Sequence, residues 1–419
     1  MYKLVINGGI PLKGSINIAG SKNSSLPILF ASILADEPIK LNNTPHLSDV
    51  STTLRLLMDM GAEFILESDG SLFVDSSNLT TLVAEYAMVK TMRASILTLG
   101  PMLAKYKQAK VSLPGGCAIG SRPVNLHLKA LEEMGATIEV KNGYIYAKAD
   151  KLVGTNISFD QISVTATENI IMAATLAQGT TTIYNAAQEP EITDLINCLN
   201  KMGAKISGEG TSTLTIKGVK KLGGVTHDVC PDRIEAGTYL VAAAITGGSV
   251  TVKNIRPQSM RSIIGKLIEI GADIKTGKNS ISLDMCGRRP KAVSVKTGTY
   301  PNFPTDMQAQ FTALNTIADG HSTITETIFE NRFMHIPELS RMGANLSLEG
   351  NTVVCKGVKS LTGANLMATD LRASASLVLA GLAANGTTTI DRVYHLDRGY
   401  ETIEEKLQLL GANIERVQD

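Results

Sequence analysis

One cysteine lies in a segment rich in glycine and proline. Residues 113–123 hold three glycines and two prolines around Cys117, and this composition predicts a loop with exposed backbone N–H groups. Arg122 follows five residues later, and a thiol with an ordinary pKa of about 8.5 ionises more readily beside a cation. Cys117 is therefore a candidate acid or nucleophile. The loop also reads G-x-x-x-x-G, but Ser-Arg follows where a phosphate-binding loop needs Lys-Ser/Thr, so that function is not expected.

Lysine and arginine recur at or near predicted helix starts. A helix N-terminus offers unpaired N–H groups and a partial positive charge, and an added cation makes it a site for phosphate or carboxylate. The alternative is that each cation is only a solvated partner of a nearby aspartate. Recurrence in equivalent positions favours the anion site. The residues are Lys22, Arg93, Arg122, Arg233, Arg332, Arg372 and Arg398.

Two aspartates are candidate bases. Asp306 follows Pro304 at a predicted helix start, and Asp370 stands two residues before Arg372 in a similar position. Helix capping explains either aspartate equally well. A base role requires a substrate hydroxyl nearby, so both alternatives stay open at this point.

A repeat must position these residues. An apolar residue followed by Gly-Ala recurs six times, with the glycines at 61, 135, 203, 271, 343 and 411, which are 74, 68, 68, 72 and 68 residues apart. Helical apolar spacing precedes each glycine and an alternating strand follows it. Glycine just past a helix is expected to adopt a left-handed backbone. The longest spacing, 74 residues, contains the Cys117 loop.

A second motif has the same period. An alanine-rich helix is followed by a Thr/Val/Ile strand, with glycine between them at 179, 247, 320 and 386 and looser copies at 38–41 and 108–113. Each repeat therefore holds about two helices and three or four strands. We expect an α/β (α+β) fold of two domains with three repeats each, and the alanine-rich helix of each repeat should be the buried one.

Composition narrows the class of protein. The 419 residues carry a net charge of +1 and 4% aromatic residues, so neither nucleic acid nor a membrane surface is an expected partner. The start of the chain does not resemble a signal peptide, and its apolar runs are too short to span a bilayer. The five scattered cysteines form no CxxC pair, which predicts free thiols in a reducing cytoplasm, with Cys198 and Cys355 in the core. We expect no metal and no cofactor.

At these motifs the chain resembles the enolpyruvyl transferases, and most closely the branch that acts on UDP-N-acetylglucosamine. The resemblance covers essentially the whole chain and is most specific at 20–23, 114–123, 303–306, 330–335, 370–373 and 397–400. It implies two inside-out α/β barrels, each of three βαβαββ units. One domain would be 22–231, with a lid at about 112–123, and the other 1–21 with 232–419. The active site would lie in the cleft between them.

The resemblance also implies a reaction. The 3′-hydroxyl of UDP-N-acetylglucosamine would attack C2 of phosphoenolpyruvate while C3 takes a proton, and the tetrahedral intermediate would then expel phosphate. This is the committed step of bacterial peptidoglycan synthesis. Cys117 would protonate C3 and could carry a covalent adduct, and Asp306 would be the base. Lys22, Arg122 and Arg398 would hold the phosphate and carboxylate.

Further binding residues follow from the same resemblance. Asp370 and Arg372 would support the phosphate side, and Arg332 is a further substrate-binding candidate. The expected sugar-nucleotide contacts are Asn23, Arg93, Arg122, Pro123, Val124, Asn125, Leu126, Gln161, Ser163, Val164 and Ile328. Two of them depart from the family pattern, because many members have lysine where Gln161 stands and aspartate where Asn125 stands.

Two other functions are considered. The family branch that acts on shikimate 3-phosphate lacks the lid cysteine and has a different lysine motif from Ser21-Lys22-Asn23. A non-catalytic scaffold that binds sugar nucleotides would have no need of Cys117, Asp306 and the cations together. Phosphate release on mixing the two substrates distinguishes all three, and the sequence does not indicate an oligomeric state.

Overall fold

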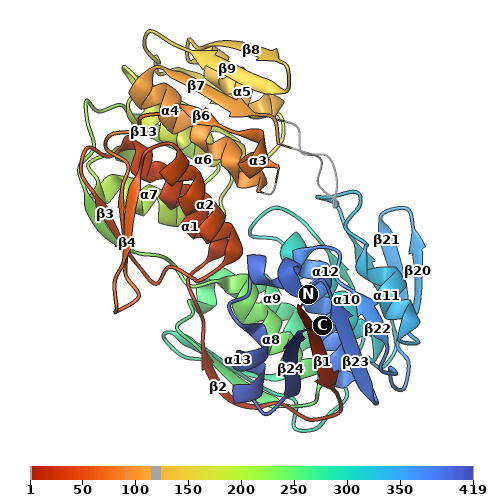
Figure 1. The fold of residues 1–419 in the computed structure, drawn as a ribbon. Helices are drawn as coiled ribbons and strands as arrows, with labels where there is room; N and C mark the ends of the chain where they lie inside the picture. Colours follow the sequence, from red (N-terminus) through yellow and green to blue (C-terminus); the bar gives the residue numbers. More distant parts are fainter. Residues whose placement is uncertain (1, 91, 115–123, 419) are drawn as a thin grey trace. The chain divides into compact units, whose positions relative to one another are not determined.

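The computed structural model describes residues 2–90, 92–114 and 124–418, which fold into two compact units. The described part of the first unit is 20–90, 92–114 and 124–230, and that of the second unit is 2–19 with 231–418. Figure 1 shows the elements of each unit. The predicted functional domains, with their boundaries at 21/22 and 231/232, remain a prediction.

The described residues form six four-stranded sheets with one shared topology, three in each unit. In every sheet the first two strands are parallel, and the third and fourth are added antiparallel. This is the βαβαββ repeat that the family resemblance implies, and it agrees with the three or four strands per repeat predicted from the sequence. The strands of the first unit, in sheet order, are β14 (Val225–Asp228), β3 (Ile39–Asn42), β5 (Leu72–Asp75), β4 (Glu63–Leu66); β6 (Val83–Ala84), β7 (Gln108–Ser112), β9 (Tyr144–Lys148), β8 (Thr137–Lys141); β10 (Asn156–Ser158), β11 (Thr180–Tyr184), β13 (Thr213–Lys217), β12 (Lys205–Ser207).

Both ends of the chain complete sheets of the second unit. β1 pairs with β23 and β24, so the first and last strands lie side by side (Figure 1), and β2 runs parallel to β15. The strands of this unit, in sheet order, are β2 (Lys13–Asn17), β15 (Ser249–Lys253), β17 (Ser280–Asp284), β16 (Asp273–Thr276); β18 (Val295–Lys296), β19 (His321–Thr325), β21 (Thr352–Lys356), β20 (Asn345–Glu349); β22 (Asn365–Met367), β23 (Thr387–Asp391), β1 (Tyr2–Asn7), β24 (Asn413–Gln418).

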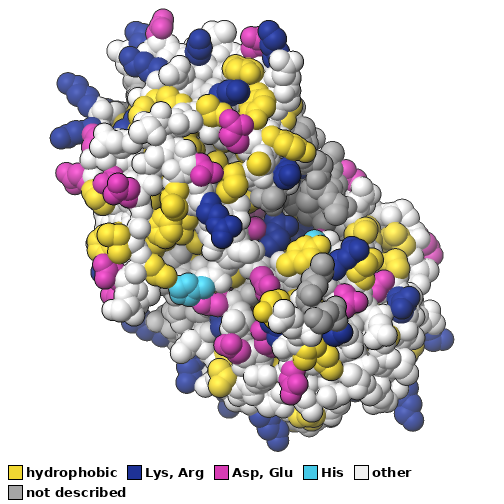
Figure 2. Space-filling view, in the orientation of Figure 1, with side chains coloured by type: hydrophobic (Ala, Val, Ile, Leu, Met, Phe, Trp, Pro, Cys, Tyr) yellow, Lys and Arg dark blue, Asp and Glu magenta, His cyan; other side chains and the backbone are white. Residues whose placement is uncertain are grey.

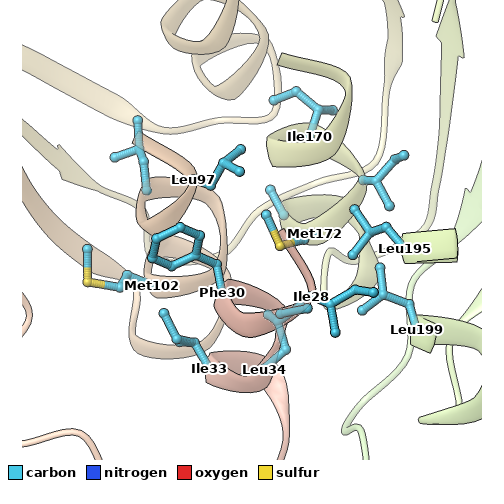
Figure 3. Packing of buried hydrophobic residues seen from close by; sticks show 14 of the residues in the cluster. Ile28, Phe30, Ile33, Leu34, Leu97, Met102, Ile170, Met172, Leu195 and Leu199 are labelled. Carbon is cyan, nitrogen blue, oxygen red and sulfur yellow. The ribbon is translucent and has the colours of Figure 1, made fainter. Parts of the chain in front are cut away.

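Each repeat contributes one buried helix, as predicted for the alanine-rich segments. Every residue of α8 and α10 is buried, and α8, α10 and α12 pack on one another. In the first unit, side chains of α1, α4, α6 and α7 meet in one apolar core (Figure 3), with Ile28, Met102, Met172 and Leu199 among them. The buried helices are α1 (Lys22–Ala31), α4 (Leu99–Tyr106), α6 (Val164–Thr175), α8 (Arg233–Ile245), α10 (Gln308–Thr316) and α12 (Leu371–Ala383).

The other helices bury one face only, as their amphipathic patterns require. They are α2 (Ser48–Asp59), α5 (Asn125–Glu133), α7 (Pro190–Lys201), α9 (Arg261–Glu269), α11 (His335–Arg341) and α13 (Ile403–Leu409), with the short α3 (Tyr86–Val89). The 3₁₀ helices are η1 (Ser32–Leu34), η2 (Arg93–Thr98), η3 (Pro257–Met260), η4 (Thr305–Met307) and η5 (Val393–Arg398). Among the described residues, no helix has the length and hydropathy needed to cross a bilayer.

The repeated glycines have the backbone that the sequence predicts. All six Gly-Ala glycines have positive φ, between 90° and 109°, and the four glycines of the second motif have φ between 68° and 114°. Asparagines form a third repeated feature that the sequence analysis missed. Asn43, Asn185 and Asn254 each follow the second strand of a sheet with φ near 57°. The side-chain amide of each donates to a carbonyl just past the neighbouring parallel strand.

One close approach between buried helices yields a test. Gly100 of α4 donates its N–H to Asn169 Oδ1 of α6 at 2.7 Å, and a Cβ at Gly100 would lie 2.3 Å from that oxygen and 2.4 Å from the Asn169 carbonyl oxygen. We expect Gly100→Ala to lower the free energy of unfolding by about 1–3 kcal/mol, because backbone must shift. Urea denaturation measures this change.

Gly265 provides the matched control. It lies inside α9, and a Cβ there meets nothing within 4 Å. Gly265→Ala should leave stability unchanged or raise it by about 0.5–1 kcal/mol, since alanine is the better helix former. Equal effects of the two substitutions would contradict the packing account.

Candidate active site

Asp306 of the second unit is held by two arginines. Arg332 Nη2 lies 2.7 Å from Asp306 Oδ1, and Arg372 Nη2 donates to Oδ2 at 3.1 Å. The side chains of Arg332 and Arg372 are 7% and 3% exposed, whereas that of Asp306 is 23% exposed. The arginines are therefore buried, and the carboxylate has an accessible side.

The two arginines keep Asp306 ionised. Burial alone would raise its pKa, but the positive charges of Arg372 and Arg332, and their hydrogen bonds, hold the pKa well below its ordinary value. Asp306 lies in η4, directly before α10, and its carboxylate binds arginines. Asp370 takes the capping role instead, because its Oδ1 accepts the N–H groups of Arg372 and Ala373 at the start of α12.

Arg372 is itself oriented by a buried hydroxyl that the sequence analysis missed. Its Nη1 donates to Tyr400 Oη at 3.1 Å, and Tyr400 is fully buried. The same hydroxyl lies 2.9 Å from Thr238 Oγ1 of α8, and Gln310 Nε2 of α10 donates to it at 3.4 Å. The three buried helices of the unit thus meet at the group that fixes Arg372.

Arg398 does not lie at a helix start. It is the last residue of η5, five residues before α13 begins. Its neighbour Asp397 receives Arg416 Nη1 and Nη2 at 3.1 and 2.7 Å, and Arg416 also binds Glu404 of α13. Arg416 thereby ties the turn that carries Arg398 to α13 and β24. No motif singled out Arg416, whose partners Glu404 and Asp397 lie 12 and 19 residues before it in the chain.

In the first unit, Lys22 and Asn23 begin α1, one of the buried helices. Lys22 Nζ lies 2.7 Å from Asp49 Oδ2 in the first turn of α2, and both side chains are largely buried. The same end of α1 is anchored by Asp194 of α7, which accepts hydrogen bonds from Ser24 Oγ and the Cys230 N–H. The cation predicted to bind an anion therefore has a fixed position and a carboxylate partner.

A second group of predicted residues gathers around His127. Asn169 Nδ2 lies 3.0 Å from His127 Nδ1, and Thr165 Oγ1 lies 3.3 Å from Nε2. His127 belongs to α5, which begins at Asn125, and Thr165 to α6, which Ser163 caps by accepting the Ala166 N–H. This buried histidine joins the helix starts that carry Val124, Asn125, Leu126, Ser163 and Val164.

The charge of Arg93 reaches the same histidine. Burial, and secondly the Arg93 charge, lower the pKa of His127 to about 4. The ring is thus neutral at physiological pH and acts as a hydrogen-bonding spacer. Gln161, by contrast, is exposed in the loop before α6, and Asn125 is exposed at the first position of α5.

Three predicted site residues, Cys117, Arg122 and Pro123, lie outside the described residues, as does most of the predicted lid. Of the thiols that the structure describes, Cys198, Cys230 and Cys355 are buried, as predicted for Cys198 and Cys355, and Cys286 is exposed. Lysine, arginine and acidic side chains are interspersed on the face in Figure 2, so no single sign of charge covers it. The predicted site residues described here form clusters within each unit.

Solved structures define the class of protein first. The enolpyruvyl transferase NikO from Streptomyces tendae matches 100% of this chain and 99% of its own with a TM-score of 0.90 and 24% identity. EPSP synthase from Acinetobacter baumannii matches 100% of both chains with a TM-score of 0.77 and 19% identity. These likenesses confirm the predicted two-domain inside-out α/β fold.

Sequence comparisons then define the family. The model of the family described as EPSP synthase (3-phosphoshikimate 1-carboxyvinyltransferase) matches residues 6–407. Proteins named UDP-N-acetylglucosamine 1-carboxyvinyltransferase from Ruthia magnifica subsp. Calyptogena magnifica and Vesicomyosocius okutanii subsp. Calyptogena okutanii (strain HA) are 83% and 79% identical over all 419 residues, with 100% of each chain covered. The chain belongs to this family, the enolpyruvyl transferases.

The neutral state of His127 predicts a pH dependence of stability. Between about pH 4 and 6.5 the unfolded chain binds a proton at this residue that the folded chain does not, so stability rises with pH across this window. The contribution of neutral His127 to the free energy of unfolding is fully present above its pKa in the unfolded chain, about 6.5. It is lost as the pH falls toward its pKa in the folded chain, about 4. Its upper bound is about 3 kcal/mol.

Denaturation at several pH values checks this expectation. We expect His127→Gln to flatten the pH dependence relative to the unsubstituted chain. His321→Gln, at an exposed position in β19, is the control and should leave it unchanged. An unchanged slope in His127→Gln would contradict the assignment.

Proposed function

We propose that this chain transfers the enolpyruvyl group of phosphoenolpyruvate to the 3′-hydroxyl of UDP-N-acetylglucosamine and releases phosphate. The names of the full-length relatives at 83% and 79% identity support this substrate. The structural observation that carries the proposal is Asp306, an ionised and partly accessible carboxylate fixed by two buried arginines. The proposal includes a place in peptidoglycan synthesis and a cytoplasmic location.

The proposed reaction is an addition followed by an elimination. The sugar oxygen forms a bond to C2 of phosphoenolpyruvate, its proton passes to Asp306, and C3 takes a proton from Cys117. In the second step C3 returns a proton to the Cys117 thiolate, the double bond re-forms, and the bond from C2 to the phosphate oxygen breaks while the leaving phosphate takes up the proton held by Asp306. Inorganic phosphate and the enolpyruvyl ether are the products, so atoms and electrons balance.

The low pKa of Asp306 constrains the order of events. A strongly ionised carboxylate is a weak base toward a neutral alcohol, because efficient proton transfer needs a favourable pKa difference. The hydroxyl proton becomes acidic as the new bond to carbon forms. Proton transfer to Asp306 therefore accompanies or follows bond formation, and the carboxylate is in its working form throughout the neutral pH range.

The cations complete the proposed machinery. We assign Lys22, Arg122 and Arg398 to the phosphate and carboxylate of phosphoenolpyruvate, with Asp370 and Arg372 supporting the phosphate side and Arg332 as a further substrate contact. Asn23, Arg93, Gln161, Ser163, Val164, Ile328 and the run from Arg122 to Leu126 are assigned to the sugar nucleotide. Fixed charge-assisted bonds of this kind add about 1.5–3 kcal/mol each.

The assignment of Cys117 predicts selective alkylation. Burial raises the pKa of Cys198 and Cys355 to about 12 and also raises that of Cys230, and the hydrogen bond to Asp273 raises that of exposed Cys286. None of these four described thiols favours the thiolate. We expect one equivalent of fosfomycin to modify the protein, at Cys117, as measured by peptide mass spectrometry.

A general thiol reagent supplies the comparison. Iodoacetamide should also reach Cys286, because that side chain is exposed. Cys286→Ser should keep the fosfomycin adduct, and Cys117→Ala should lose both the adduct and turnover while remaining folded. An adduct on Cys198 or Cys355 would refute the assignment.

Asp306 is tested by removing its charge. Asp306→Asn should reduce turnover by about 10²–10⁴-fold, the usual contribution of a positioned base, while the affinity for UDP-N-acetylglucosamine measured by calorimetry changes little. Asp273→Asn is the control, because Asp273 also pairs with an arginine, Arg288, but lies exposed. Near-normal turnover of Asp306→Asn would remove Asp306 as the base.

Phosphate release tests the function as a whole. Phosphoenolpyruvate with UDP-N-acetylglucosamine should release phosphate continuously, whereas phosphoenolpyruvate with shikimate 3-phosphate should not. Release only with shikimate 3-phosphate would favour the other family branch. Binding of the sugar nucleotide without any release would indicate a non-catalytic scaffold.

A further inference from the structure

We propose that Glu326 is a positioning residue for the transfer reaction, and this inference rests on the proposed function. Glu326 directly follows β19, and only 2% of its surface is exposed. Its carboxylate binds two segments at once: the one that fixes Arg332 against Asp306, and the one that contains Ile328. Glu326 would thus position both Asp306, the proposed base, and Ile328, a proposed contact to the sugar nucleotide.

The first segment is reached through a hydroxyl relay. Arg332 Nη1 donates to Thr305 Oγ1 at 2.9 Å, and Thr305 Oγ1 donates in turn to Glu326 Oε2 at 2.8 Å. The guanidinium has only donors, so the hydroxyl must accept from it and pass its own hydrogen onward. Residue 326 must therefore offer an acceptor at this point, and a carboxylate satisfies that requirement.

The relay bears directly on the base. Arg332 uses Nη1 for Thr305 and Nη2 for Asp306, which is the next residue in η4. The Arg332 guanidinium thereby binds the consecutive side chains of Thr305 and Asp306, and Glu326 fixes its orientation through the Thr305 hydroxyl.

The second segment is held by the other carboxylate oxygen. Glu326 Oε1 accepts the N–H groups of Ile328 at 2.7 Å and Phe329 at 3.2 Å. It also accepts the hydroxyl of Thr297 at 2.8 Å. These bonds bend the chain after β19 into a fixed turn, and the Phe329 ring lies 5.4 Å from the Arg332 guanidinium. The turn therefore presents Ile328 in one defined position.

The residue directly after the second strand differs among the repeats. The position directly after the second strand of a sheet holds a left-handed asparagine in three repeats, at 43, 185 and 254. Each asparagine only ties the neighbouring strand. In the β19 repeat the position holds Glu326, which is not among the residues with positive φ and reaches toward Asp306 instead. The two remaining repeats hold Leu113 after β7 and the left-handed Arg392 after β23.

Two variants separate the two segments. Thr305→Val interrupts only the relay and should lower kcat by about tenfold or more, because small misplacements of reacting groups are costly. Its KM for UDP-N-acetylglucosamine should stay within about twofold of the unsubstituted value. Glu326→Gln disturbs both segments, so kcat should fall and this KM should rise together.

Conservative and distant variants provide the controls. Thr305→Ser keeps the hydroxyl and should restore kcat, which a purely steric role for the methyl group would not allow. Glu349→Gln, at an exposed position at the end of β20, should match the unsubstituted chain. Melting temperatures are recorded for every variant, and if Glu326→Gln does not fold, the Thr305→Val and Thr305→Ser pair carries the test.

The outcomes distinguish this inference from the function on which it rests. If the unsubstituted chain releases no phosphate from the named substrates, the proposed function fails. If it does and folded Thr305→Val retains normal kcat, the positioning role of Glu326 through Thr305 is overturned. It is also overturned if Thr305→Ser is as impaired as Thr305→Val. A loss of kcat in Thr305→Val, restored in Thr305→Ser, supports it.

Discussion

A carboxylate shared by two buried guanidiniums is the interaction on which the rest of the candidate site depends. Two buried positive charges require an anion, and Asp306 supplies it from a short turn while keeping one side accessible. Removing either partner of such a group leaves an uncompensated charge, which is costly in a poorly solvated environment. The surrounding hydroxyls of Thr305 and Tyr400 are thus constrained to orient the arginines.

The repeat architecture explains how that interaction is built. Each repeat buries one helix, and the helix starts deliver polar groups from segments far apart in the chain: Asp306 directly before α10 and Arg372 in α12, with Tyr400 following η5. In the first unit the same arrangement places Lys22 at the start of α1 and joins α5 to α6 through His127.

Much of this could be predicted from the sequence, because the signals are local. The Gly-Ala motif marks a left-handed backbone that glycine adopts easily, so it predicted six helix ends and six repeats arranged as two domains of three. The same reasoning left Asp306 and Asp370 equivalent, because capping and ion pairing require the same residue type. Only the fold shows that Asp370 caps α12 and Asp306 meets two arginines. Glu326 and Arg416 belong to no motif, and only the fold shows which side chains they bind.

The central claim is that Asp306 is an ionised carboxylate at neutral pH because Arg332 and Arg372 hold it. Carbon-13 NMR of protein labelled at the aspartate carboxyl carbons measures this directly, with Asp306→Asn identifying the resonance. The account predicts that this resonance stays at its ionised position from neutral pH down to the ordinary aspartate pKa of about 3.9. A titration midpoint at or above about 3.9 would contradict the account, because the arginines would then not govern the carboxylate.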